Sequence, residues 1–153
     1  MKWTELTYDD AKNVLEEDIQ AVERSFGVVF PKEFRKFLRI ANGAYIKESD
    51  FDFTDAKGEN VSSGIGVVMR FDDSATPDVF EIHQRLAEYQ NAKIIPFAET
   101  GGGDYICFDF GKDASPQVAY FFHELGEYVF LANDFESFIS KLYLPADVEA
   151  DHG

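Results

Sequence analysis

The sequence predicts a single α+β domain, with a mostly antiparallel, twisted sheet and helices packed on one face. Two observations lead to this fold class. The chain has 153 residues, which is close to the size of one domain. Its hydrophobic residues recur first with a helical period and then with a strand period, without repeated βαβ units. We expect the domain to cover residues 1–145 and an acidic tail to cover residues 146–153.

Two amphipathic helices are expected near the start of the chain. One helical face of the first carries Ile19, Val22 and Phe26, and Gly27 ends this helix. Pro31 begins the second, because the first helical position tolerates a missing N–H. Its apolar face carries Phe34, Phe37, Leu38 and Ala41. Gly43 ends it, since glycine accepts the positive φ of a sharp turn.

The period of the hydrophobic residues changes to two after this helix. Polar and apolar residues alternate over 45–54, which indicates a strand with one exposed face. Residues 55–64 are polar and contain glycine, so we expect a loop there, followed by a strand over 65–71. A third helix begins at Pro77 or Asp78, and its buried stripe is Val79, Ile82, Leu86 and Tyr89.

The second half of the chain contains four further candidate strands, over residues 93–97, 105–110, 117–122 and 128–131. Their connections are short, which favours antiparallel pairing because a parallel partner needs a long crossover. Asn133 or Asp134 caps a last helix whose apolar residues are Phe135, Phe138, Ile139 and Leu142.

The charge balance restricts the partners of this chain. There are 14 Lys and Arg against 29 Asp and Glu, so the formal net charge is 14 − 29 = −15. Nucleic acids and anionic membranes are disfavoured, because binding to phosphates depends on clustered basic residues. The 16 phenylalanines are explained by a packed core and require no cofactor.

Cysteine content and the apolar runs bear on the cellular compartment. The single cysteine, Cys107, cannot form an internal disulfide, and the start of the sequence lacks the apolar stretch of a secretory signal. The longest apolar runs are far shorter than the roughly 20 residues of a membrane span. We therefore expect a cytoplasmic protein.

Few residues in this sequence suggest catalysis. Three scattered histidines and one cysteine do not have zinc-ligand spacing, so we expect no metal and no cofactor. Cys107 lies in an apolar strand and is expected to be a buried, unreactive thiol. One catalytic alternative stays open, a small hydrolase that uses His123 with Asp104 or Asp109.

A glycine run precedes the second of these late strands. Gly101, Gly102 and Gly103 are followed by Asp104, but neither a Lys-Ser/Thr pair nor an opening helix follows, so a phosphate site is not indicated. We expect a tight bend in which Asp104 accepts hydrogen bonds from backbone N–H groups.

The order of short segments along the chain resembles a known family. The first half contains Asp18–Glu23, Phe26–Val28, Phe30–Phe34, Phe37–Leu38 and Asn42–Ala44. The second half contains Ile95–Phe97, Gly101–Asp104, Ile106–Asp109, Val118, Phe121–His123 and Asp134–Ile139. This ordered set resembles the SUKH superfamily, with Phe30 in place of a leucine and Ala44 in place of a second glycine. Residues 50–90 carry no part of the resemblance.

The resemblance implies a noncatalytic binding protein. SUKH proteins include bacterial immunity proteins of polymorphic toxin systems and a yeast regulator of cell-wall synthesis. We therefore expect an antitoxin that covers the basic active site of a cognate toxin, and we expect this toxin to be a nuclease. The alternative is a regulatory scaffold that binds a signalling or cell-wall protein. Neither the toxin's identity nor the oligomeric state can be derived from the sequence.

Two sets of residues are candidates for these roles. The partner-binding set shares negative charge in the stretch outside the resemblance: Asp50, Asp52, Asp55, Glu59, Asp72 and Asp73. The fold-determining set shares the family pattern: Glu23, Pro31, Gly43, Gly101, Gly102, Gly103, Asp104 and Asp109. Within it, Glu23 is expected to bind donors near the bend at 101–104.

Overall fold

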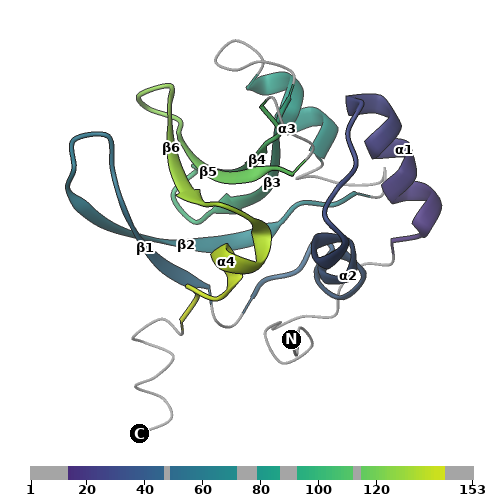
Figure 1. Ribbon diagram of the computed structural model, residues 1–153, viewed down its shortest axis with the longest axis horizontal. Helices are drawn as coiled ribbons and strands as arrows, with labels where there is room; N and C mark the ends of the chain where they lie inside the picture. The colour runs from purple at the N-terminus through teal and green to yellow at the C-terminus, as the bar shows by residue number, and fades with distance from the viewer. Residues whose placement is uncertain (1–13, 47–48, 72–78, 87–92, 112–114, 144–153) are drawn as a thin grey trace, which may run out of the picture.

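The computed structural model describes residues 14–46, 49–71, 79–86, 93–111 and 115–143. These residues form four helices and six strands (Figure 1). All six strands belong to one sheet in which each strand pairs antiparallel with the next along the chain. The predicted α+β class with an antiparallel sheet is confirmed. No helix within the described ranges is long and apolar enough to cross a membrane.

Helix α1 (Glu16–Phe26) forms where the helical period predicts it. Its buried face contains Ile19, Val22 and Glu23. Gly27 follows with a φ of 67°, in the left-handed region that glycine adopts without steric cost, and its N–H bonds to the carbonyl of Glu23. The predicted end of this helix is therefore confirmed.

Helix α2 (Lys32–Ala41) buries Phe34, Phe37, Leu38 and Ala41, the four residues predicted from their spacing. Pro31 is the N-cap residue of α2 and has an extended ψ. It therefore lies one position before the first helical residue, which is the position that the sequence predicts for it. Gly43 has a φ of 72° in the turn after the helix, as a chain reversal there requires. Asn42 is fully buried, and its side-chain oxygen accepts a 2.8 Å hydrogen bond from the N–H of Phe71.

The strands are β1 (Asp50–Thr54), β2 (Asn60–Val68), β3 (Ile94–Thr100), β4 (Tyr105–Asp109), β5 (Gln117–Phe122) and β6 (Glu127–Ala132). The four late strands predicted from the sequence correspond to β3 to β6. In β1 the predicted alternation is also present, because Phe51 and Phe53 are buried while Asp52 and Thr54 are exposed.

The predicted loop over residues 55–64 is wrong in its second half. Only residues 55–59 form the turn, and β2 begins at Asn60 and pairs with β1 through Gly64. Its first residues are polar because that part of the sheet is exposed, so composition alone indicated a loop. Residues 60–64 form a strand because they hydrogen-bond to β1, and amino-acid composition carries no information about this pairing.

The sheet curls so that its two edges approach each other. Phe53 of β1 stacks on Tyr120 of β5 with ring centroids 4.6 Å apart, although three strands separate β1 and β5 in the sheet order. The two edge strands, β1 and β6, face each other across this curl (Figure 1).

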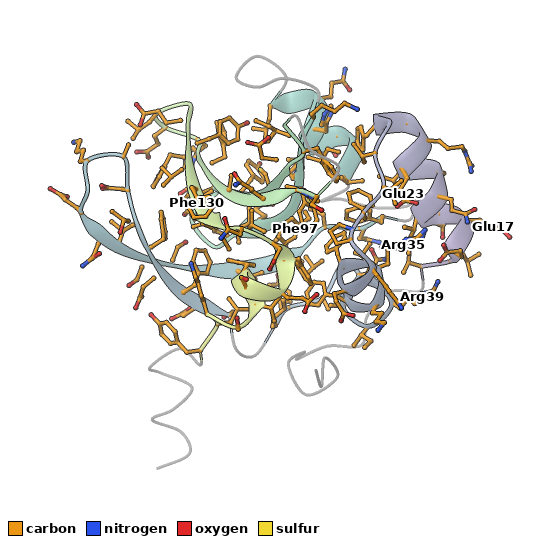
Figure 2. The ribbon with its side chains drawn as sticks, in the orientation of Figure 1. Glu17, Glu23, Arg35, Arg39, Phe97 and Phe130 are labelled. Atoms are coloured by element: carbon orange, nitrogen blue, oxygen red, sulfur yellow. The ribbon has the colours of Figure 1, made fainter. Side chains whose placement is uncertain are left out.

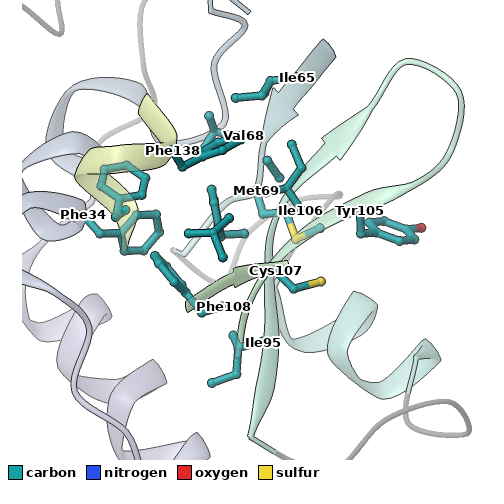
Figure 3. Packing of buried hydrophobic residues seen from close by; sticks show 14 of the residues in the cluster. Phe34, Ile65, Val68, Met69, Ile95, Tyr105, Ile106, Cys107, Phe108 and Phe138 are labelled. Atoms are coloured by element: carbon teal, nitrogen blue, oxygen red, sulfur yellow. The ribbon is translucent and has the colours of Figure 1, made fainter. Parts of the chain in front are cut away.

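Phenylalanines fill the inner side of the curled sheet. The ring of Phe34 on α2 lies 4.8 Å from that of Phe108 on β4, and Phe108 stacks on Phe97 of β3 at 4.5 Å. Figure 3 shows Phe34, Phe108 and Phe138 gathered on one side of the strands, whereas Cys107 points to the other side. Each buried phenylalanine stabilises the fold by about 1.5 to 3 kcal/mol before entropy is subtracted.

The last two helices complete the core. Helix α3 (Val79–Arg85) packs against β3, and Val79, Ile82 and Leu86 are buried as predicted. Figure 3 draws α3 beyond the Cys107 side of β4 and α4 beyond the Phe108 side. Helices therefore cover both faces of the sheet, whereas the sequence predicts them on one face; Cys107 and Phe108 are both fully buried for this reason. Asp134 caps α4 (Phe135–Ile139) by accepting a 2.8 Å hydrogen bond from the N–H of Ser137. The predicted helix start at Pro77 or Asp78, Tyr89 and the tail at 146–153 lie outside the described residues.

Candidate partner-binding site

Four of the six predicted partner-binding residues lie together on the β1–β2 hairpin. Asp52 and Glu59 are exposed, and Asp50 and Asp55 are partly buried. The other two, Asp72 and Asp73, lie outside the described residues. This hairpin projects from the body of the domain, away from α1 and α2 (Figure 1).

Asp52 is an anchored carboxylate on the outer face of β1. Its Oδ1 accepts hydrogen bonds from the hydroxyl of Ser62 at 2.6 Å and from the hydroxyl of Tyr143 at 2.7 Å. These two bonds, that of Ser62 first, lower the pKa of Asp52 below its usual value. The side chain is therefore an anion at neutral pH, held at a fixed place on an exposed strand.

Asp55 has a structural role that the sequence analysis did not assign. Its Oδ1 accepts hydrogen bonds from the backbone N–H groups of Lys57 and Glu59, both at 2.9 Å. Asp55 therefore organises the turn between β1 and β2, in the manner typical of aspartate in turns. One of its carboxylate oxygens is engaged in this way, so Asp55 is less available to a partner than the sequence suggested.

A groove lies beside this hairpin, between the two edge strands of the sheet. Its volume is about 500 Å³. The residues that line it come from β1, β2, β6 and the segment after α4: Asp52, Phe53, Thr54, Asn60, Val129, Phe130, Leu131 and Lys141. No local pattern in the sequence indicates this groove, because its walls are about 75 residues apart in the chain and meet only through the curl of the sheet.

Lys141 lies at one end of the groove. Its ammonium group donates a 2.6 Å hydrogen bond to the backbone carbonyl of Leu131. Leu131 is the extra residue where the register between β5 and β6 shifts, so its carbonyl departs from the regular ladder. Lys141 thus covers an edge carbonyl that the bulge exposes, a known way of protecting sheet edges.

Glu23, one of the predicted fold-determining residues, has its hydrogen-bond partners in the N-terminal part of the chain, so its predicted contact with the bend at 101–104 is wrong. Its Oε2 accepts a 2.7 Å hydrogen bond from the N–H of Phe30, and its Oε1 accepts one of 3.0 Å from Arg35. Glu23 therefore links α1 to the connector and to α2 (Figure 2). The Glu16 side chain, which binds both Arg35 and Arg39, extends this network toward the surface.

Asp104 is the centre of a polar network at the bend. Its Oδ1 accepts a 2.9 Å hydrogen bond from the N–H of His123, which follows β5, and not from an N–H of the bend itself as predicted. The imidazole Nδ1 of His123 lies 2.5 Å from the same oxygen, and the hydroxyl of Tyr120 donates to Oδ2 at 2.7 Å. Gly103 has a φ of 91° at this bend, and a Cβ placed on it would lie 3.6 Å from the His123 ring.

The order of groups in this network bears on the hydrolase alternative. Burial, together with the bond to the Asp104 carboxylate, raises the pKa of Tyr120 to about 12, so the phenol keeps its proton. Ser63, 3.0 Å from the Tyr120 oxygen, is thereby separated from His123 by a phenol and a carboxylate. Covalent catalysis requires direct contact between nucleophile and base, and the hydroxyl of Ser63 has no such contact with His123 among the described residues.

The remaining candidate residues have structural surroundings. Asp109 pairs with Ile94 and Gln117 in the sheet and has no hydrogen bond to His123 in the described structure. Cys107 is fully buried, as predicted, and burial raises the pKa of its thiol strongly. Within the described ranges, no group of three or more His, Cys, Asp or Glu side chains is placed to hold a metal ion.

Comparison with known proteins agrees with this architecture. The family model described as the SMI1 / KNR4 family (SUKH-1) matches residues 13–141. That range contains every helix and strand from α1 to α4, together with the Glu23 network and the bend at Asp104. No match was found among curated proteins. Because the match covers most of the sequence and the resemblance of the ordered segments points the same way, the chain belongs to the SMI1/KNR4 family (SUKH-1).

Proposed function

We propose that this protein is an immunity protein that binds a cognate toxin and neutralises it by covering its active site. The observation that carries the proposal is the family match over residues 13–141, because SUKH proteins are immunity or regulatory proteins that act by binding. The protein would act in the cytoplasm, where an intracellular toxin has its target.

The charge of the chain supports a nuclease as the target. A nuclease has a basic cleft that holds phosphates, and a partner with a net charge of −15 is attracted to such a cleft. Association steered in this way reaches about 10⁸ to 10⁹ M⁻¹ s⁻¹ at low salt. We place the contact on the β1–β2 hairpin, with Asp50, Asp52 and Glu59 as the principal anions and with Asp55 beside them. Asp72 and Asp73, which lie outside the described residues, stay in the proposed set because of their charge.

The order of side chains in the Asp104 network supports a noncatalytic mechanism. His123 and Asp104 are in contact, but the hydroxyl groups of Ser63 and Tyr120 are held on the far side of the carboxylate. These side chains bind one another: Asp104 at the bend bonds to Tyr120 of β5, and Tyr120 bonds to Ser63 of β2. The network thus joins the bend, β5 and β2. Neutralisation would therefore come from occupying the surface of the toxin, with no bond made or broken.

The direct test is co-expression. The gene next to the one for this protein would be expressed alone and together with it, and cell survival measured. We expect death in the first case and survival in the second, with a complex recovered on purification. Survival without this protein, or death in its presence, would refute the immunity proposal, and turnover of a substrate by the purified protein would refute the noncatalytic mechanism.

A matched pair of variants tests the binding surface. Glu59→Lys reverses a charge at the exposed hairpin, and Glu17→Lys makes the same change on exposed α1 (Figure 2). We expect slower association with the toxin and a shallower salt dependence for Glu59→Lys only. Equal rates for the two variants would place the contact elsewhere.

The alternative function is regulatory binding, as in the yeast members of this family. The observation in its favour is the same family match, because the SUKH resemblance implies regulatory proteins as well as immunity proteins. Co-expression separates the two functions, because a regulatory scaffold would not protect cells from a neighbouring toxin.

A further inference from the structure

One edge of β1 has backbone groups that face away from the sheet. The N–H and C=O of Asp50 both bond to Tyr143, on the side opposite β2, at 3.0 and 2.9 Å. The N–H and C=O of alternate residues in an antiparallel strand point to the same side. The backbone groups of Asp52 and Thr54 therefore point away from β2 as well. In the described part of the chain, only the Asp50 position of this edge has a backbone partner.

This edge opens into the groove between β1 and β6. Asp52, Phe53 and Thr54 form one wall, and Val129, Phe130 and Leu131 form the other. Phe130 is 54% exposed, and Figure 2 shows it between β6 and the β1–β2 hairpin. The groove thus combines free hydrogen-bonding groups on one side with an apolar surface on the other.

The two faces of β1 determine which side chains a neighbouring strand would need. Phe53 points inward, toward Tyr120, so residues beside it would be apolar. Asp52 and Thr54 point outward, with Asp55 and Glu59 at the turn, so residues on that face would be basic. A second copy of this chain, pairing through its own β1, would instead place like charges opposite one another.

We propose that the β1 edge and this groove bind an extended segment of the partner protein that alternates basic and apolar residues. The segment adds to the sheet as an antiparallel strand beside Asp52 and Thr54, in the manner of β-augmentation. Its apolar side chains contact Phe53 and Phe130, and its basic side chains face Asp52. The assignment of the segment to a toxin rests on the proposed function; the groove and its chemistry do not.

The antiparallel register makes a specific prediction about the backbone of the bound segment. Residues directly opposite Asp52 and Thr54 share their outward face and exchange hydrogen bonds with them. The basic residues of the segment therefore donate their N–H groups to β1, whereas the N–H groups of the apolar residues point to the other side.

The probe for this proposal is the labelled hexapeptide acetyl-Lys-Val-Lys-Val-Lys-Val-amide, with binding to the full chain followed by fluorescence anisotropy. We expect saturable binding that N-methylation of the lysine amides weakens at least tenfold and N-methylation of the valine amides changes less than threefold. The peptide with glutamate in place of lysine should not bind. Equal effects of the two methylation patterns would overturn the strand-addition geometry.

Variants of the protein provide the second test. Thr54→Pro removes an edge N–H, which an edge strand tolerates, and Phe130→Ser removes the apolar wall. Leu125→Ser is the matched control, because Leu125 is 63% exposed on the β5–β6 turn and does not line the groove. We expect tenfold weaker peptide binding for Thr54→Pro and Phe130→Ser and no change for Leu125→Ser. Circular dichroism verifies folding, and Phe130→Ser decides the matter if Thr54→Pro unfolds.

The outcomes separate this inference from the proposed function. Loss of peptide binding in Phe130→Ser, with no toxin found, supports the groove and refutes only the immunity role. Protection from a toxin that survives Phe130→Ser and Thr54→Pro unchanged refutes the groove and leaves the immunity role standing. Concentration-dependent dimerisation abolished by Thr54→Pro would also overturn the inference, since the occupant would then be a second copy.

Discussion

Replacement of Glu23 by alanine should destabilise the fold more than any other single carboxylate removal on α1 or α2. Glu23 is 8% exposed and accepts hydrogen bonds from the buried N–H of Phe30 and from Arg35. The alanine variant leaves the Phe30 N–H without a partner, which costs about 1 to 3 kcal/mol, and loses a charged hydrogen bond of similar size. Arg35 keeps its contact with Glu16, which limits the total.

We expect a loss of about 3 kcal/mol in the free energy of unfolding, measured by urea denaturation. For a chain of this size that loss lowers the melting temperature by roughly 6 to 12 °C. Glu23→Gln keeps one acceptor oxygen and should lose less. Glu33→Ala is the matched control, because Glu33 forms a partly exposed pair with Lys36 and should change stability by less than about 0.5 kcal/mol.

A double-mutant cycle with Arg35→Ala isolates the ion pair from the backbone contact. If the Phe30 N–H carries most of the effect, Glu23→Ala should remain strongly destabilising when Arg35 is already absent. A Glu23→Ala variant within about 0.5 kcal/mol of the wild type would refute the reasoning, because it would mean that water replaces both hydrogen bonds without cost.

Three further predictions concern the core and the last helix. Asp134→Ala removes the α4 cap and should cost about 1 kcal/mol at neutral pH. Since bonds to Ser137 lower the pKa of Asp134, that contribution is present above the unfolded pKa and disappears as pH falls below about 4, which urea titrations at several pH values would show. Phe34→Ala should cost about 3 to 5 kcal/mol in the same assay, and a loss below 2 would contradict the packing described. Cys107 should react with a disulfide reagent only after unfolding; rapid reaction in the native protein would contradict its burial.

Local patterns were sufficient to predict most of the elements. The spacing of Phe34, Phe37 and Leu38 identified the buried face of α2, because a helix with one apolar stripe can pack in only one orientation. Gly27 and Gly43 marked helix ends for a backbone reason that holds regardless of the tertiary structure. The bounds of β5 were predicted correctly, since its continuous apolar run is flanked by polar residues and turns.

Contacts between distant segments could not be predicted in this way. The sequence predicts a loop for the first half of β2, because an exposed strand paired on one side has the composition of a loop. The network that joins Asp104 to Tyr120 and His123 links residues 16 and 19 positions apart, and no local pattern pairs them. The groove depends on the curl that brings Phe53 onto Tyr120, which no local pattern encodes.

Acidic residues on the β1 edge have two consequences that arise from one physical cause. An exposed strand edge is a site of uncontrolled pairing, and charged residues along it discourage pairing with other copies. The same charges attract a basic strand, so protection against self-association and selection of the partner come together. Raising the salt concentration should weaken both effects in parallel. A protein that remains monomeric in high salt while losing the basic peptide would show that its edge is protected by shape, and that charge serves recognition alone.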